Sequence, residues 1–240
     1  MNNAKELISI IIPCFNEEKT LNEVVARIHA AQVPRDYEIV VIDDCSTDKS
    51  VQIAELLLSK RLIDKLKVHN RNLGKGAAIR TGIEVSSGSI VLIQDADLEY
   101  SPADYSNLLA PILEGSAQVV YGSRYISPTI QKGVLFHRTL ANKFLTRLSN
   151  TFTGLELSDM ETCYKIFRKH TLKTQILKEN RFGFEPEFTA LVARQNLNVV
   201  ELPISYFPRT KTEGKKIGFK DGLRAIWVIV FCGLQRNKGF

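Results

Sequence analysis

The chain has 240 residues, of which 44% are hydrophobic and 24% charged, a balance that excludes a disordered chain and suits an α/β domain. Its net charge of +6 favours an anionic partner such as a phosphorylated substrate, an anionic lipid surface or nucleic acid. The four cysteines lack metal-ligand spacing, and no apolar run is long enough to span a bilayer. The N-terminal segment lacks a signal-peptide pattern, so we expect a cytoplasmic protein with reduced cysteines.

Short β-rich runs alternate with helical patterns in the first half of the chain. The expected strands are Leu7–Ile12, Tyr37–Ile42, Leu66–His69 and Ser89–Ile93. Helices with apolar residues at helical spacing are expected between them, at Glu18–Ala31, 51–58 and Ala77–Val85. Strands joined by helical crossovers predict an α/β fold with a mostly parallel sheet flanked by helices, in which the carboxyl ends of the strands face one ligand-binding crevice.

The second half of the chain is less regular. Helices are expected from Ser101 or Pro102 onward, at His137–Thr151 and at Glu187–Arg194. Further strands are expected at Gln118–Tyr121, Thr162–Phe167 and Asn198–Leu202. The composition changes only after Pro208, where a basic segment begins.

Asp95 and Asp97 lie one residue apart, just after a predicted buried strand. Two carboxylates in such a turn can converge on one divalent cation, which also takes phosphate oxygens and water. The same pair could merely cap the next helix, and the tripeptide alone favours that alternative. However, Asp43-Asp44 and Asn16-Glu17 end two other strands at the same edge of the predicted sheet. This repeated placement favours a ligand-binding site.

Seven segments occur in the order found in the family 2 glycosyltransferases, and the chain resembles within them the dolichol-phosphate mannosyltransferase-like group. The segments are Ile10–Glu18, Val41–Asp48, Asn72–Ala77, Gln94–Leu98, Gly122–Arg124, Asp159–Lys165 and Phe182–Glu187. The resemblance extends from about Ile8 to Gly222, and the ordered set is far more specific than any one segment. It implies a GT-A-like, nucleotide-binding fold and a nucleoside-diphosphate sugar as the donor.

The resemblance also implies roles for residues at the strand ends. Asp95 and Asp97 would hold Mg²⁺ or Mn²⁺ on the diphosphate, and either Asp43 or Asp44 would hold the base. Glu99 stands where the compared mannosyltransferases often have Gln, and it could ligate the metal as well. A P-loop is excluded because its pattern is absent around Gly74 and Lys75. The residues expected to contact the donor are Pro13, Phe15, Asn16, Glu17, Asp43, Asp44, Gly74, Lys75, Asp95 and Ala96.

Several residues are candidates for the reaction centre together with Asp97. Arg124 follows a predicted strand, and its guanidinium could bind phosphate, although a plain surface arginine is the alternative. Asp159 and Glu161 are implied to lie on the acceptor side. Either could deprotonate a hydroxyl acceptor, but a phosphate acceptor needs little base catalysis, so we favour a positioning role for them. Arg209 is expected to stabilise phosphate charge.

The C-terminal segment combines a basic cluster with an apolar run. Six cations precede Ala225–Phe231, which contains the only Trp: Arg209, Lys211, Lys215, Lys216, Lys220 and Arg224. We therefore expect a catalytic domain over 1–208, followed by a basic loop and an amphipathic helix over 209–240. This pattern suits attachment to the cytoplasmic face of a membrane, with Arg209 and Lys211 binding a lipid phosphate; a helix packed on the core is the alternative.

The predicted function is the metal-dependent, inverting transfer of a hexose from a nucleoside-diphosphate sugar to a polyprenyl phosphate. A sugar or polysaccharide hydroxyl is the alternative acceptor, and it would make Asp159 or Glu161 essential as a base. Nucleotidyl transfer, which would release pyrophosphate, is a second enzymatic alternative. A nucleic-acid-binding module fits less well, because the predicted crevice is acidic and the cations concentrate near the C-terminus.

Overall fold

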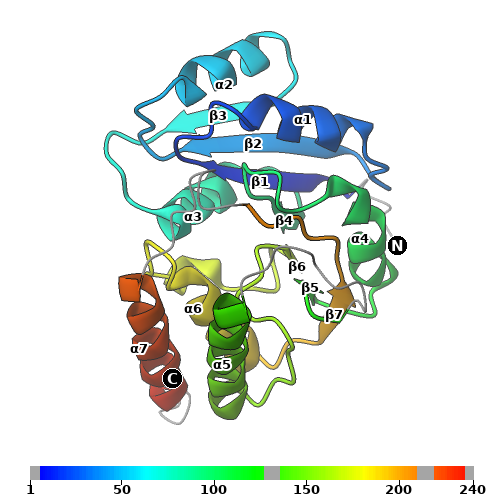
Figure 1. Cartoon of the computed structure of the whole chain (residues 1–240). Coiled ribbons are helices and arrows are strands. Elements are labelled where there is room, and N and C mark those ends of the chain that lie inside the picture. Colours follow the sequence, from blue (N-terminus) through cyan, green and yellow to red (C-terminus); the bar gives the residue numbers. More distant parts are fainter. Residues whose placement is uncertain (1–5, 127–135, 210–218, 236–240) are drawn as a thin grey trace.

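The computed structural model describes residues 6–126, 136–209 and 219–235, which form a seven-stranded sheet flanked by helices (Figure 1). The strands are β1 (Ile8–Cys14), β2 (Tyr37–Asp43), β3 (Lys65–Val68), β4 (Ile90–Ile93), β5 (Val119–Ser123), β6 (Lys165–Arg168) and β7 (Val199–Pro203). The α-helices are α1 (Leu21–Ala30), α2 (Ser50–Ser59), α3 (Lys75–Val85), α4 (Tyr105–Glu114), α5 (Phe136–Thr153), α6 (Phe184–Arg194) and α7 (Phe219–Gln235).

The strand order places β1 near the middle of the sheet. The order is β3-β2-β1-β4-β6-β5-β7, and β1 pairs in parallel with both β2 and β4. Within this sheet, β6 runs antiparallel to its neighbours β4 and β5. The chain moves outward from β1 to β3 and then returns to β4, so the loops after β1 and β4 diverge and leave room for a ligand. The predicted α/β fold with a mostly parallel sheet is thereby confirmed.

The core surrounds the central strands. Ile8, Ile10, Ile11 and Ile12 of β1 are fully buried, as is the run Ile90–Leu92 in β4. A parallel strand covered on both faces needs apolar side chains in both directions, which explains why these strands are continuous apolar runs.

Two helix boundaries differ from the sequence prediction for local reasons. α1 begins at Leu21 because residues 17–20 form a turn, in which the Thr20 hydroxyl donates to the carbonyl oxygen of Ala96 at 2.8 Å. α6 begins at Phe184, one turn earlier than expected, and includes Pro186. Proline is tolerated there because the first turn of a helix has no intrahelical acceptor for its N–H groups.

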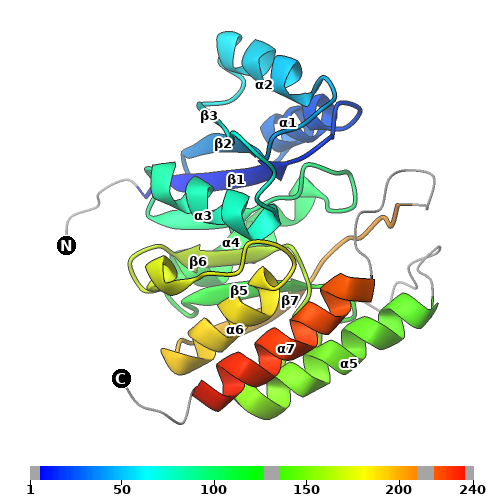
Figure 2. The ribbon, with the colours of Figure 1, turned by 90° about the vertical axis from the view of Figure 1, so that its left-hand side faces the viewer.

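Helix α7 packs beside α5 and also contacts α6, as Figure 2 shows. Its Cys232 carbonyl accepts a 3.0 Å hydrogen bond from Arg194 of α6, and Gly233 lies against the ring of Phe152 in α5. Helix α7 therefore packs on the domain, and the attachment of its exposed side to a membrane stays a prediction. None of the described helices is long and apolar enough to cross a membrane. The division at residue 208 stays a prediction, and the loop 210–218, with Lys211, lies outside the described residues.

Two glycines at the start of α3 allow a close approach of the segment 178–183. Gly74 has a φ of +104°, and a Cβ there would lie 2.4 Å from the carbonyl oxygen of Asn180. A Cβ at Gly76 would lie 2.3 Å from the carbonyl oxygen of Glu179. The amide of Ala77 donates to the Asn180 oxygen at 3.0 Å, which closes the contact. The absence of side chains at these two glycines therefore allows the backbone at the start of α3 to contact the backbone of segment 178–183.

We expect Gly76→Ala to lower the free energy of unfolding by about 1–3 kcal/mol, because the added methyl forces segment 178–183 away from α3. Urea unfolding followed by circular dichroism measures the change. Gly222→Ala is the matched control, since Gly222 also lies in a helix but an added Cβ has no described atom within 4 Å. That variant is expected to gain up to about 1 kcal/mol. Equal effects of the two substitutions would contradict the contact.

Candidate active site

A cavity of about 420 Å³ lies where the loops after β1, β2 and β4 meet the start of α3. Most of the predicted site residues line it: Pro13, Phe15, Glu17, Asp44, Gly74, Lys75, Asp95, Ala96, Asp97, Glu99 and Arg209. The predicted residues outside its lining are Asn16, Asp43, Arg124, Asp159 and Glu161. The sheet therefore brings most of the strand-end residues to one cavity, and the acceptor-side candidates Asp159 and Glu161 lie outside its lining.

The two aspartates after β2 have different surroundings. Asp43 is fully buried, and its carboxylate accepts hydrogen bonds from the amide and the hydroxyl of Ser46, at 2.8 and 2.6 Å. Asp44 lines the cavity and accepts the amides of Leu73 and Gly74, at 2.9 and 2.6 Å. Asp43 therefore holds the turn after β2 and lies outside the cavity lining, and of the two expected candidates for the base Asp44 is the one that lines the cavity. Asp44 is the aspartate that reaches the cavity, while it also holds the turn before α3.

Asn16 and Glu17 also differ in their position relative to the cavity. Asn16 has a φ of +53°, and its side-chain oxygen accepts the amide of Thr47 at 2.7 Å, so it joins two loops outside the cavity lining. Its predicted donor contact stays a prediction. Glu17 does line the cavity, and its carboxylate pairs with Arg209 at 2.7 Å.

Lys75, the first residue of α3, is placed between two carboxylates. Its Nζ lies 2.8 Å from Asp95 and 3.3 Å from Glu185. Burial alone would lower the pKa of Lys75, but the charges of Asp95 and Glu185 overcome it and hold that pKa well above its ordinary value. Lys75 is therefore a permanent cation on the wall of the cavity, positioned to bind an anion.

Arg209 reaches the cavity from the segment after β7. Its guanidinium donates to both carboxylate oxygens of Glu17, at 3.3 and 2.7 Å, and its Nε lies 3.6 Å from Asp97. The Arg209 amide donates to Glu99 at 2.8 Å, and the Tyr206 hydroxyl donates to the other oxygen of Glu99 at 2.9 Å. Glu99 thus fixes the chain that carries Arg209.

The expected set of three metal ligands is not formed. Within the described ranges, no group of three Asp, Glu, His or Cys side chains is placed to hold a metal ion. Glu99 is the residue that stays apart from this set, because its carboxylate oxygens accept hydrogen bonds from the Tyr206 hydroxyl and the Arg209 amide. The side chains of Asp95 and Asp97 are 21% and 19% exposed in the cavity. Two such carboxylates fit a divalent cation whose other ligands are diphosphate oxygens and water.

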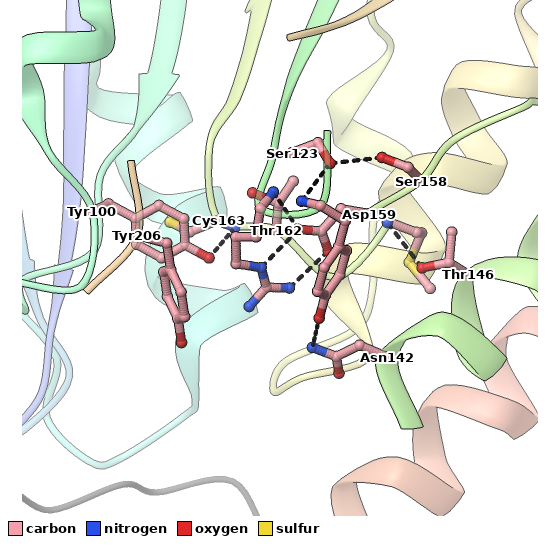
Figure 3. A network of polar contacts seen from close by, with 12 residues as sticks. Tyr100, Ser123, Asn142, Thr146, Ser158, Asp159, Thr162, Cys163 and Tyr206 are labelled. Atoms are coloured by element: carbon pink, nitrogen blue, oxygen red, sulfur yellow. Dashed lines mark hydrogen bonds and ion pairs between the residues drawn. The ribbon is translucent and has the colours of Figure 1, made fainter. Parts of the chain in front are cut away.

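Arg124, just after β5, is held by Asp159. Figure 3 shows Asp159 within a network of polar contacts. The Nε and Nη2 of Arg124 donate to the two carboxylate oxygens at 2.7 Å each, and its guanidinium lies 5.3 Å from the centre of the Tyr206 ring. The neighbouring contact between the hydroxyls of Ser123 and Ser158 is 2.6 Å. Asp159 is fully buried, so its surroundings suit the favoured positioning role and not that of a base.

Glu161 lies near the buried residues Lys165 and Glu185. Its Oε1 is shielded from solvent and has no hydrogen-bond partner among the residues the structure describes. Burial and the charge of Glu185 raise the pKa of Glu161 to about 8, against the opposing effect of Lys165. Glu161 is therefore mostly protonated at neutral pH, which makes it a poor base. It also lies outside the cavity lining.

Sequence reasoning missed Arg181 and Phe182, which line the cavity from the segment before α6. Phe182 begins one of the seven segments that carry the resemblance, so the sequence did mark this region as one shared with the family. Its place at the cavity nevertheless depends on the contact of segment 178–183 with Gly74 and Gly76, which no local pattern predicts.

Comparisons with known proteins found relatives that match most of this chain. An undecaprenyl-phosphate 4-deoxy-4-formamido-L-arabinose transferase of Aeromonas hydrophila is 29% identical over 238 residues, covering 97% of this chain and 69% of the relative. A dolichol-phosphate mannosyltransferase of Pyrococcus furiosus is 29% identical over 213 residues, covering 88% of this chain and 59% of the relative. The chain thus spans only part of the length of these relatives.

The fold is similar to that of a solved glucosyl-3-phosphoglycerate synthase of Mycobacterium tuberculosis in complex with Mn²⁺, UDP and glucosyl-3-phosphoglycerate. The TM-score is 0.71 at 19% identity, over 95% of this chain and 80% of the other, which supports a GT-A fold. The family model described as glycosyl transferase family 2 matches residues 9–175, which is more than half of the chain. With its strand-end cavity and the resemblance of its ordered motifs, the chain belongs to glycosyltransferase family 2.

Proposed function

We propose that this protein transfers a hexose from a nucleoside-diphosphate sugar to a polyprenyl phosphate at a membrane surface, with inversion at the transferred carbon. The observation that carries the proposal is the cavity in which Asp95, Asp97, Lys75 and Arg209 meet. Carboxylates for a divalent cation and cations for phosphate oxygens are what a metal-bound diphosphate requires. The Mn²⁺ and UDP bound by a protein of similar fold, and the polyprenyl-phosphate acceptors in the names of two relatives, add support.

The described residues can be assigned roles in this reaction. Asp95 and Asp97 would hold Mg²⁺ or Mn²⁺, which when bound neutralises charge on the leaving diphosphate. Lys75 and Arg209 would bind phosphate oxygens in exchange for their present carboxylate partners. Pro13, Phe15 and Ala96 would line the donor, with Asp44 beside them.

We assign Arg124 and Asp159 a positioning role. Asp159 orients Arg124, whose guanidinium packs on the ring of Tyr206. Tyr206 donates to Glu99, and Glu99 accepts the amide of Arg209. This chain of contacts holds the backbone of Arg209 at the cavity, where its side chain can meet the phosphate that develops charge during transfer.

The surroundings of the acidic candidates favour a phosphate acceptor over a hydroxyl. A hydroxyl acceptor requires a base within hydrogen-bond reach, whereas a phosphate is already ionised near neutral pH. Asp159 is buried in its pair with Arg124, and Glu161 keeps its proton at neutral pH. Neither residue lines the cavity.

An apolar surface on α5 and α7 supports attachment to a membrane. Its exposed side chains are Leu140, Phe144, Leu223, Trp227, Phe231 and Leu234. The rings of Trp227 and Phe231 are stacked at 4.7 Å, and Arg224 lies 4.3 Å from the centre of the Trp227 ring. A cation beside exposed aromatic residues suits the interface of an anionic bilayer. All four cysteines are free, which suits the cytoplasmic face.

We expect the protein, incubated with Mn²⁺, radiolabelled nucleotide sugars and polyprenyl phosphate, to transfer label from one donor into the organic phase. Asp97→Asn should lower this transfer at least about a hundredfold, because a carboxylate for the cation is lost. Glu161→Gln should retain most of it, and Glu114→Gln, an exposed substitution on α4, is the control. Label on a sugar hydroxyl but not on lipid, lost in Glu161→Gln, would contradict the phosphate acceptor.

We expect the wild-type protein to lose stability relative to Glu161→Gln as the pH rises from about 4.5 to about 8. Glu161 ionises near its ordinary pKa of 4.5 when unfolded but keeps its proton to about 8 when folded. Its stabilising contribution is therefore full below the lower value and is lost as the pH rises through the upper one. The charged neighbours Glu185, Lys165, Arg124 and Asp159 are unchanged in the variant. Urea unfolding across this pH range tests the difference, and parallel curves would refute it.

We expect Trp227→Ser combined with Phe231→Ser to weaken binding to anionic vesicles at least about tenfold, because each buried aromatic side chain contributes about 1.5–3 kcal/mol. Cosedimentation measures the affinity, and a blue shift of the fluorescence of Trp227, the only Trp, reports its insertion. Leu56→Ser with Leu58→Ser is the control, since both leucines are exposed on α2 at the other end of the molecule (Figure 1). Unchanged binding of the aromatic variant would contradict the membrane surface.

A further inference from the structure

Arg181 is a cation of the cavity that the roles assigned so far do not use. It lines the cavity from segment 178–183, just before α6, and the residue is exposed. Its guanidinium makes no hydrogen bond or ion pair with any other residue in the described part of the chain. A charged side chain on the wall of a cavity, with its donors unused, is available to a ligand.

The backbone that carries Arg181 is held in place from several sides. Its neighbour Asn180 accepts the amide of Ala77 at 3.0 Å, and Arg80 donates both to the Glu179 carbonyl and to the Asn180 side chain. The carboxylate of Glu187 accepts the amides of residues 178 and 179, at 2.8 to 3.0 Å. The position of Arg181 at the cavity is therefore built by the fold, since these bonds fix the segment independently of the arginine side chain.

Arg181 differs from the other two cations of the cavity in its ion pairing. Lys75 is shared between Asp95 and Glu185, and Arg209 between Glu17 and Asp97. Both cations are thus already balanced by carboxylates. Arg181 differs, because none of the described carboxylates pairs with it. An anionic ligand gains the full attraction of this cation without first breaking an ion pair.

We propose that Arg181 is a phosphate-binding residue of this cavity. Its planar guanidinium offers paired N–H donors that match the oxygens of a phosphate group. The phosphate belongs either to the diphosphate of the donor or to the lipid acceptor, two sources with the same chemistry. The assignment rests on the proposed function for its choice of ligands, but the binding itself is measurable without any transfer.

The test compares the wild-type protein with Arg181→Gln and Arg181→Lys by isothermal titration calorimetry. The ligands are UDP and GDP with Mn²⁺, the corresponding nucleosides, and a short-chain polyprenyl phosphate in detergent. Arg71→Gln is the matched control. Arg71 is also exposed and precedes the lining residue Asn72 in the sequence, but it does not itself line the cavity. Urea unfolding checks that each variant is folded.

We expect Arg181→Gln to weaken binding of at least one phosphate ligand about tenfold or more, with Arg181→Lys recovering part of the loss and both nucleosides binding as before. A loss with UDP or GDP assigns Arg181 to the donor diphosphate, and a loss with polyprenyl phosphate alone assigns it to the acceptor. Unchanged affinity for every phosphate ligand that the wild type binds would overturn the inference and leave the proposed function standing.

Two further results separate the inference from the proposed function. If phosphate binding depends on Arg181 but no polyprenyl phosphate is glycosylated, the inference stands and the proposed acceptor fails. If the wild-type protein binds neither nucleoside diphosphates nor polyprenyl phosphate, both are overturned.

Discussion

The parallel pairing of β1 with β2 on one side and β4 on the other is the constraint on which the site depends. The register is set by buried apolar residues on all three strands, with Cys14 opposite Asp43 and Ile11 opposite Ile93. The pairing continues past the strand ends, where the Asp44 amide donates to Cys14 at 2.8 Å. A shift of one residue along β2 or β4 would move the loop that follows that strand relative to the loop after β1. The acidic loops therefore leave the sheet side by side, and the cavity forms between them.

The cavity lining has five carboxylates and three cations, and two of the cations, Lys75 and Arg209, are each placed against carboxylates. Removing one partner from a buried pair leaves an uncompensated charge, which is costly in a medium of low dielectric constant. A ligand that brings both a divalent cation and phosphate groups can replace these partners in kind, with the cation on Asp95 and Asp97 and the phosphates on Lys75 and Arg209. This exchange explains how a paired, folded cavity can still be a binding site.

Segment 178–183 connects the cavity with the apolar surface of α5 and α7. Arg224 of α7 pairs with Glu179 at 2.6 Å and also lies on the ring of Trp227, which belongs to that surface. Two residues further along, Arg181 lines the cavity. The proposed lipid contact and the proposed donor site are thus joined through a few residues. A lipid acceptor needs this proximity, because its phosphate lies at the bilayer surface while its chain remains inside.

The sequence by itself determined the class of fold and most of the strand-end site, because strand runs, helical spacing and acidic turns are local patterns. Asp44, Lys75, Asp95 and Asp97 were identified in this way, and all four line the cavity. Tertiary structure decided the partners of the neighbouring residues: Asp43 and Asn16 accept hydrogen bonds from Ser46 and Thr47, and Glu99, at the cavity, accepts from Tyr206. It also brought Arg181 to the cavity and buried Asp159 against Arg124. The physical reason is that hydrogen bonding and burial of these polar groups depend on partners distant in sequence, which no local pattern specifies.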